Sequence, residues 1–116
     1  MSQDDLRRQG QEMYKRLFGK ERGEPATAFD EVTLEHLFAK IWSREGLSTR
    51  DRSLITVSIL AAMGRENELR THLKGLHNQG FGPREIVEVM IHVAHYAGWP
   101  AGNTGLRVAR ELQIVP

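Results

Sequence analysis

The sequence predicts an all-α fold, a single-domain bundle of about six helices. Apolar residues recur at the three- and four-residue spacing of a helix through most of the chain. Glycine and proline residues divide these stretches into segments, and no stretch shows the apolar and polar alternation of a strand. A chain of 116 residues and 13.2 kDa fits one compact domain.

The first two helices are predicted at Asp4–Phe18, which ends at Gly19, and at Phe29–Trp42. The polar loop between them makes residues 1–28 an N-terminal helix and loop arm, and residues 29–116 the helical core. The second helix carries one apolar stripe at helical spacing, formed by Leu34, Leu37, Phe38 and Ile41.

The third helix begins at a pattern resembling a capping box, Ser48 and Asp51, and runs to Gly64. Its second half is apolar nearly all round, which predicts a position inside the bundle or against another subunit. The fourth helix is predicted at Glu66–Asn78 and closes at Gly80. Its buried line is expected to be Leu69, Leu73 and Leu76.

The fifth helix begins at Pro83 and is broken by Gly98 and Pro100. Tyr96 and Trp99 flank this break, and as aromatic residues they are expected to cover the core. A sixth helix covers roughly residues 101–112. The inward side of the fifth helix is predicted to consist of Ile86, Val87, Val89, Met90 and Val93.

Composition excludes several classes of function. The 16 Lys and Arg residues nearly balance the 15 Asp and Glu residues, so no field of one sign indicates nucleic acid or an anionic membrane. The absence of cysteine excludes disulfides, thiol redox chemistry and thiolate metal sites. The balanced charge favours neutral partners or a small ligand. The polar N-terminus and the lack of a long apolar run predict a soluble cytoplasmic protein with no membrane span.

Two polar clusters are candidates for chemistry. Glu68 and His72 stand four residues apart, on one helix face, where a carboxylate and an imidazole can share a proton. Such pairs also arise often by chance on helix surfaces. Glu88, His92 and His95 offer three metal-ligand types on one helix, but one helix rarely completes a metal site, so no metal is predicted.

Two long motifs point to a family. Residues 47–80, LSTRDRSLITVSILAAMGRENELRTHLKGLHNQG, and residues 83–103, PREIVEVMIHVAHYAGWPAGN, resemble the carboxymuconolactone decarboxylase family. Residues 10–19, GQEMYKRLFG, resemble the segment before the core in γ-carboxymuconolactone decarboxylases proper. The resemblance implies a fold like that of the alkyl hydroperoxidase D proteins, in ring-shaped homo-trimers or homo-hexamers.

The resemblance also separates this chain from its redox-active relatives. Peroxidases of the superfamily carry two cysteines and a glutamate at the positions of Arg65, Glu68 and Ser53, and this chain keeps only the histidine, His72. Without these cysteines, disulfide-based peroxidase chemistry is excluded. Decarboxylases proper commonly have histidine at the position of Arg107 and often cysteine at that of Ala97, and these departures leave the substrate open.

The function implied is a carboxy-lyase that needs no cofactor, because the unsaturated lactone of γ-carboxymuconolactone is its own electron sink. The reaction requires a proton donor and a cation. His72 suits the donor, and Glu68 would orient it and stabilise its charged form. Arg52 and Arg65 are candidates for holding a substrate carboxylate, although they could equally form ordinary surface ion pairs.

The predicted substrate-binding residues are completed by Ser53, Tyr96, Trp99 and Asn103, the last three as pocket lining. The substrate would be a small lactone carboxylate, and the product the enol-lactone of β-ketoadipate, in protocatechuate breakdown. Two alternatives stay open: an enzyme of the same fold acting on another lactone or small carbonyl acid, and a non-catalytic oligomeric protein that binds a small molecule.

Overall fold

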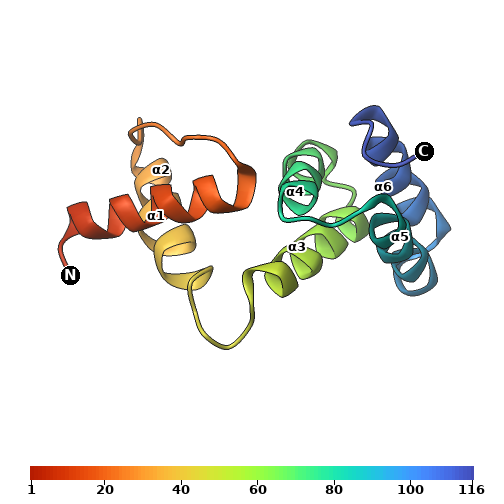
Figure 1. Ribbon diagram of the computed structural model, residues 1–116, viewed down its shortest axis with the longest axis horizontal. Coiled ribbons are helices and arrows are strands. Elements are labelled where there is room, and N and C mark those ends of the chain that lie inside the picture. The colour runs from red at the N-terminus through yellow and green to blue at the C-terminus, as the bar shows by residue number, and fades with distance from the viewer. The chain divides into compact units, whose positions relative to one another are not determined.

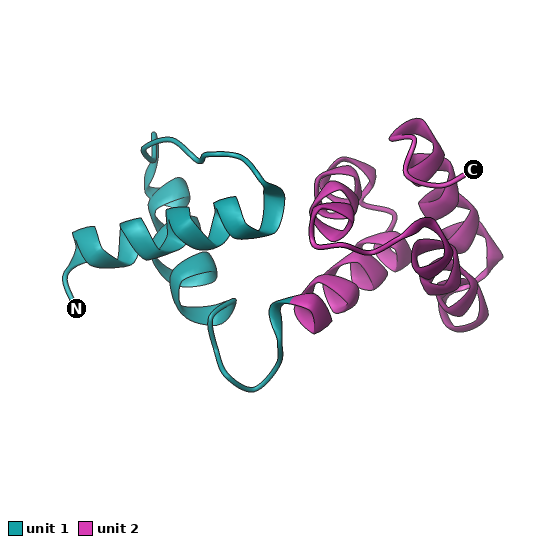
Figure 2. Ribbon diagram, in the orientation of Figure 1, with its two compact units in different colours: residues 1–49 teal, residues 50–116 magenta.

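A computed structural model describes residues 1–116 and contains helices and no strands, which confirms the all-α prediction (Figure 1). Contacts within the chain group it into two compact units, residues 1–49 and residues 50–116 (Figure 2). The predicted division into an arm, residues 1–28, and a core, residues 29–116, stays a prediction. None of the helices combines the length and apolar character needed to cross a bilayer.

The first unit begins with helix α1, Gln3–Phe18, as predicted. A capping box starts it, because the Asp5 backbone N–H donates to Ser2 Oγ at 3.1 Å and the Ser2 N–H donates to the Asp5 carboxylate at 3.3 Å. The helix ends at Gly19, whose φ of 73° is a left-handed conformation that suits glycine.

The second predicted helix, Phe29–Trp42, is helical over nearly the same residues, but its hydrogen bonding changes along its length. A short helix α2, Ala28–Val32, leads into a π-helix η1, Thr33–Ile41, whose end is marked by the bond from the Trp42 N–H to the Leu37 carbonyl at 3.0 Å. Bonds that span five residues change which side chains share a face. Leu37 is therefore exposed, and the buried side chains are Leu34, Phe38, Ala39 and Trp42.

Aromatic packing holds α1 against η1. The Tyr14 and Phe38 rings meet edge to face, with centroids 5.5 Å apart, and Phe18 meets Phe38 in the same way at 6.1 Å. Gly10 lets the two helices approach, since a Cβ there would lie 2.7 Å from the Leu34 carbonyl carbon. The backbone contact leaves no room for a larger residue.

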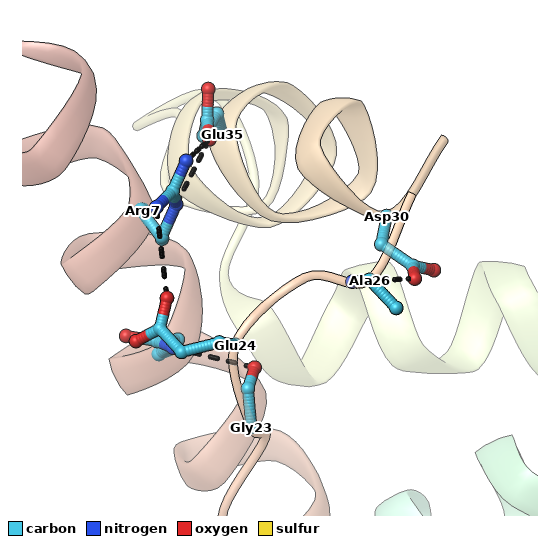
Figure 3. Close-up of polar contacts among 7 residues, drawn as sticks. Arg7, Gly23, Glu24, Ala26, Asp30 and Glu35 are labelled. Carbon is cyan, nitrogen blue, oxygen red and sulfur yellow. Dashed lines mark hydrogen bonds and ion pairs between the residues drawn. The ribbon is translucent and has the colours of Figure 1, made fainter. Parts of the chain in front are cut away.

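Polar contacts tie the loop between α1 and α2 to both of these helices, and α1 to η1 (Figure 3). Arg7 of α1 bonds the Glu35 carboxylate of η1 through Nε and Nη2, at 3.2 and 3.1 Å, and lies 3.6 Å from Glu24 of the loop. The Asp30 carboxylate accepts a bond from the Ala26 N–H at 3.2 Å. These contacts fix the path of the loop across the unit.

The second unit consists mainly of four helices, α3 (Thr49–Met63), α4 (Glu66–Asn78), α5 (Pro83–Ala97) and α6 (Trp99–Glu111). The three connections contain Gly64, Gly80 and Gly98, which all have positive φ angles, 69°, 96° and 105°. The predicted bounds of α4 are confirmed. The predicted start of α5 and both predicted ends of α6 agree with the structure to within two residues.

The core of the second unit includes the buried leucines of α4. The predicted line of α4 is fully buried and belongs to one apolar cluster with Ile86, Met90 and Val93 of α5, whereas Val87 and Val89 are only partly buried. The buried residues of α4 are Leu69, Leu73, Gly75 and Leu76.

Helix α3 is not enclosed in this core. Its buried residues are Ser53, Val57 and Ala61, while Ile55 and Ile59 on another face are 46% and 50% exposed. The expectation of a position inside the bundle is therefore wrong, because only one side of α3 reaches the core. The alternative, contact with another subunit, stays a prediction.

We expect Gly10→Ala to lower the free energy of unfolding by about 1–3 kcal/mol, because the added methyl overlaps the Leu34 backbone. Urea unfolding followed by circular dichroism would measure this. Gly46→Ala is the control, since a Cβ there meets nothing within 4 Å. An equal loss in both variants would contradict the steric explanation.

Candidate functional site

His72 owes its position to the way α4 starts and buries its leucines. The Arg65 N–H donates to the Leu60 carbonyl at 3.0 Å, and the Leu69 N–H donates to the Arg65 carbonyl at 2.8 Å, so α4 follows closely on α3. The buried Leu69 and Leu73 then orient the helix. His72 lies at the edge of this buried line and is partly exposed.

Three polar residues share one side of α4. Arg65, Glu68 and His72 stand at spacings of three and four residues, which places them along the same face. Glu68 and Arg65 are exposed, and His72 lies deeper. The face therefore presents a guanidinium, a carboxylate and a partly buried imidazole in sequence.

Burial controls the charge of His72. It lowers the pKa of the imidazole below its ordinary value of 6.5, because the charged form loses hydration, while the Glu68 carboxylate acts in the opposite direction. The predicted influence of Glu68 has the expected sign but is the smaller of the two. His72 is therefore mainly neutral at pH 7.

Ser53 is the one buried polar side chain of the structure, 4% exposed on α3. Its Oγ accepts a hydrogen bond of 2.6 Å from Nε2 of Gln79, which also donates to the Gly75 carbonyl at 3.3 Å. This bond joins α3 to the C-terminal end of α4. Sequence reasoning missed Gln79, although it stands seven residues after His72, on the same side of α4.

The candidate pocket residues Trp99 and Asn103 lie together, on a small cavity between α5 and α6. Its volume of about 60 Å³ is below the several hundred Å³ of a typical small-molecule site. The side chains that line it are Met90, Ile91, Ala94, Trp99, Gly102, Asn103 and Leu106, none of which belongs to α3 or α4.

Tyr96 and Trp99 do not cover the core, so that expectation is wrong. They are 84% and 62% exposed, because the last buried residue of α5 is Val93 and the chain turns at Gly98. Tyr96 stacks on the ring of His92, with centroids 4.8 Å apart. The substrate-binding roles of both aromatic residues stay predictions.

The two histidines of α5 have local contacts. His95 Nδ1 lies 2.7 Å from the Ile91 carbonyl, and its ring meets Trp99 edge to face at 5.6 Å. With His92 on Tyr96, both rings take part in packing on the surface of α5. No three or more acidic or histidine side chains group as metal ligands would.

Arg107 joins α6 to the start of α4. Its guanidinium pairs with Glu66 and lies 3.2 Å from Glu111. Glu111 also pairs with Arg70 of α4, at 2.5 Å. These partly exposed pairs add modest stability and give Arg107 a structural role.

The helical fold, the polar face of α4 and the order of the motifs are together typical of one class of protein. Residues 27–111 match the Carboxymuconolactone decarboxylase family, and the chain belongs to this family. The resemblance seen in the sequence is thereby confirmed.

Three individual proteins are similar to parts of this chain. The chain is 43% identical over 75 residues to 4-carboxymuconolactone decarboxylase of Acinetobacter baylyi, covering 65% of this chain and 56% of that protein. It is 34% identical over 71 residues to nitrosuccinic acid decarboxylase npaB of Metarhizium robertsii, covering 61% and 50%. An uncharacterized 15.0 kDa protein of Paracoccus denitrificans, from the nqo9-nqo10 intergenic region, is 31% identical over 81 residues, covering 68% and 60%. The chain thus spans half to three fifths of these relatives.

The lowered pKa of His72 predicts a pH dependence of stability. The folded state binds the proton less tightly than the unfolded chain, so stability falls as the pH drops through about 6.5 and levels off below the folded-state pKa. Urea unfolding at several pH values would show a smaller loss in His72→Gln than in the wild type. The control is His77→Gln, which removes an exposed histidine of α4. If His77→Gln reduced the loss of stability at low pH as much as His72→Gln does, the assignment to His72 would be contradicted.

The Ser53 to Gln79 bond predicts coupling between the two residues. We expect Gln79→Ala to cost about 1–3 kcal/mol of folding free energy, since the buried Ser53 oxygen loses its donor. The double variant Ser53→Ala, Gln79→Ala should lose less than the sum of the single losses. Additive losses in chemical denaturation would show that the bond contributes nothing.

Proposed function

We propose that this protein is a cofactor-free carboxy-lyase of the cytoplasm that converts γ-carboxymuconolactone to the enol-lactone of β-ketoadipate in protocatechuate breakdown. The observation that carries the proposal is the α4 face, where a partly buried His72 lies beside Glu68 and Arg65, in a chain of the decarboxylase family. The similarity to the Acinetobacter 4-carboxymuconolactone decarboxylase supports the same substrate.

The substrate itself explains why no cofactor is needed. The carbon that loses carbon dioxide is conjugated to the unsaturated lactone carbonyl. The electron pair of the broken bond moves through the ring to the lactone oxygen, and a proton is then added to carbon. The protein has to hold the carboxylates, stabilise the charge on oxygen and deliver that proton.

His72 delivers the proton. A partly buried imidazolium is a stronger acid than one in water, because it lacks full hydration. Glu68 and the incoming substrate carboxylates favour the protonated form, so binding charges His72 when the proton is needed. Loss of neutral carbon dioxide moves the negative charge of one carboxylate into the ring and onto the lactone oxygen, and the proton of His72 then neutralises it by adding to carbon.

The arginines anchor the substrate. Arg65 lies at the start of α4, on the same side as His72, and Arg52 precedes the buried Ser53 on α3. A guanidinium binds a carboxylate through two parallel hydrogen bonds and so fixes its direction. In this proposal Trp99 and Asn103 supply an apolar wall and an amide donor for the lactone, although the small cavity that they share contains no residue of α3 or α4.

A second candidate function keeps the scaffold and changes the substrate. The Metarhizium relative is named for nitrosuccinic acid, which is not a lactone. Arg107, which pairs with Glu66 where decarboxylases commonly have histidine, also favours a different small acid. A non-catalytic protein that binds a small molecule is the outcome if neither acid reacts.

We also propose that the chain assembles into a homo-trimer or homo-hexamer. The side of α3 away from the core exposes Ile55, Ile59 and Met63 at four-residue spacing, by 46%, 50% and 59%. An apolar stripe of this kind is typical of a surface that another protein chain covers.

The activity is tested with γ-carboxymuconolactone made enzymatically, by following the loss of its absorbance together with release of carbon dioxide. We expect turnover by the wild type and a kcat at least about a hundredfold lower for His72→Ala. Lys74→Ala, which changes an exposed residue of α4, is the matched control. No turnover by the wild type would overturn the proposal, and nitrosuccinic acid would then be tried.

The same assay tests the role of Glu68. The rate should fall as the pH rises through the pKa of His72, because the acid is then deprotonated. Glu68→Gln should move this fall to lower pH, since the carboxylate that raises the pKa is lost. An unmoved pH profile would show that Glu68 does not act on the histidine.

A further inference from the structure

The start of α3 is attached to the connection between α4 and α5 at two positions. At the first, the guanidinium carbon of Arg50 lies 4.0 Å from the centroid of the Phe81 ring, and Nη2 lies 3.6 Å from Oε2 of Glu85. At the second, Ser53 Oγ accepts the 2.6 Å hydrogen bond from Gln79 Nε2. All of these residues belong to the second unit.

Both partners of Arg50 are themselves held in place. Phe81 is 6% exposed and belongs to the apolar cluster of the second unit, so its ring has a fixed position beneath the guanidinium. Glu85 lies in the first turn of α5, where its Oε1 accepts a hydrogen bond of 3.1 Å from the Gly82 N–H. The other carboxylate oxygen, Oε2, is the one that faces Arg50. Arg50 therefore joins α3 to two groups that the rest of the unit orients.

Arg52 stands between these two attachment points. It lies close to the N-terminal end of α3, because this helix begins at Thr49. The terminal turns of a helix open more readily than its middle. The attachments at Arg50 and Ser53, on either side of Arg52 in the chain, hold this terminal turn closed and so limit where its guanidinium can lie.

We propose that Arg50 is a positioning residue, which fixes the start of α3 so that Arg52 meets a carboxylate of the substrate. The inference rests on the proposed function, in which Arg52 binds that carboxylate. In this role Arg50 acts on Arg52 and not on the substrate. A binding group whose backbone is already fixed loses less conformational freedom when the ligand binds, so the attachment raises affinity.

Steady-state kinetics with γ-carboxymuconolactone tests this role. We expect Arg50→Gln to raise KM about fivefold and to change kcat less than about twofold, because binding is weakened while the proton donor His72 is kept. Arg50→Lys, which keeps a cation for Phe81 and Glu85, should give a KM between those of the wild type and Arg50→Gln. Arg84→Gln is the matched control, since it removes the same charge from an exposed residue next to Glu85 and should leave KM unchanged.

A double variant separates positioning from a direct effect of charge. In the Arg52→Gln background, Arg50→Gln should not raise KM further, because the group that Arg50 positions is gone. A direct attraction between Arg50 and the substrate would give the same rise in both backgrounds. Circular dichroism checks that each variant keeps its helix content. Glu85→Gln, which removes the charge of the pair but keeps an acceptor for the Gly82 N–H, replaces Arg50→Gln if that variant does not fold.

The outcomes distinguish this inference from the proposed function. Absence of turnover by the wild type would overturn both. With an active wild type, the inference alone is overturned by an unchanged KM in Arg50→Gln or in Arg52→Gln. An equal rise of KM in Arg84→Gln, or the same rise from Arg50→Gln in the Arg52→Gln background, would overturn it as well.

Discussion

Burial of the leucines of α4 is the constraint on which the candidate site depends. Leu69, Leu73 and Leu76 have no exposed surface, and together they set the rotation of α4 about its own axis. That rotation brings Arg65 and Glu68 to the surface and His72 to the boundary between core and solvent. The packing of the three leucines thus determines which polar side chains of α4 lie where they can contact a ligand.

The boundary position explains why the histidine is sensitive to its surroundings. A fully exposed imidazole would keep its ordinary pKa, and a fully enclosed one would resist any charge. His72 lies between these extremes, so a change in neighbouring charge can shift its protonation. The carboxylate of Glu68 raises the pKa of His72 by less than the loss of hydration lowers it. A bound anionic substrate would add to the effect of Glu68.

The sequence predicted the features that local chemistry determines. Gly64, Gly80 and the spacing of the leucines located α4 to the residue. The spacing of Glu68 and His72, together with the family resemblance, made His72 a candidate, and its catalytic role stays a prediction. The sequence could not predict η1, because the exchange of α-helical bonds for longer ones depends on how Phe38 packs against α1. Nor did it predict the partner of Ser53, since a bond across 26 residues depends on the angle between two helices. The exposure of Tyr96 was missed for the same reason, because burial is a property of the assembled unit.

The π-helix η1 limits which deletions this segment can accept during evolution. Each hydrogen bond of a π-helix spans one residue more than that of an α-helix, so deletion of one residue within Thr33–Ile41 would allow ordinary α-helical bonding. The side chains after the deletion would rotate, and Phe38 and Trp42 could not both keep their places. The packing of this segment therefore depends on its number of residues as much as on the identity of any residue in it.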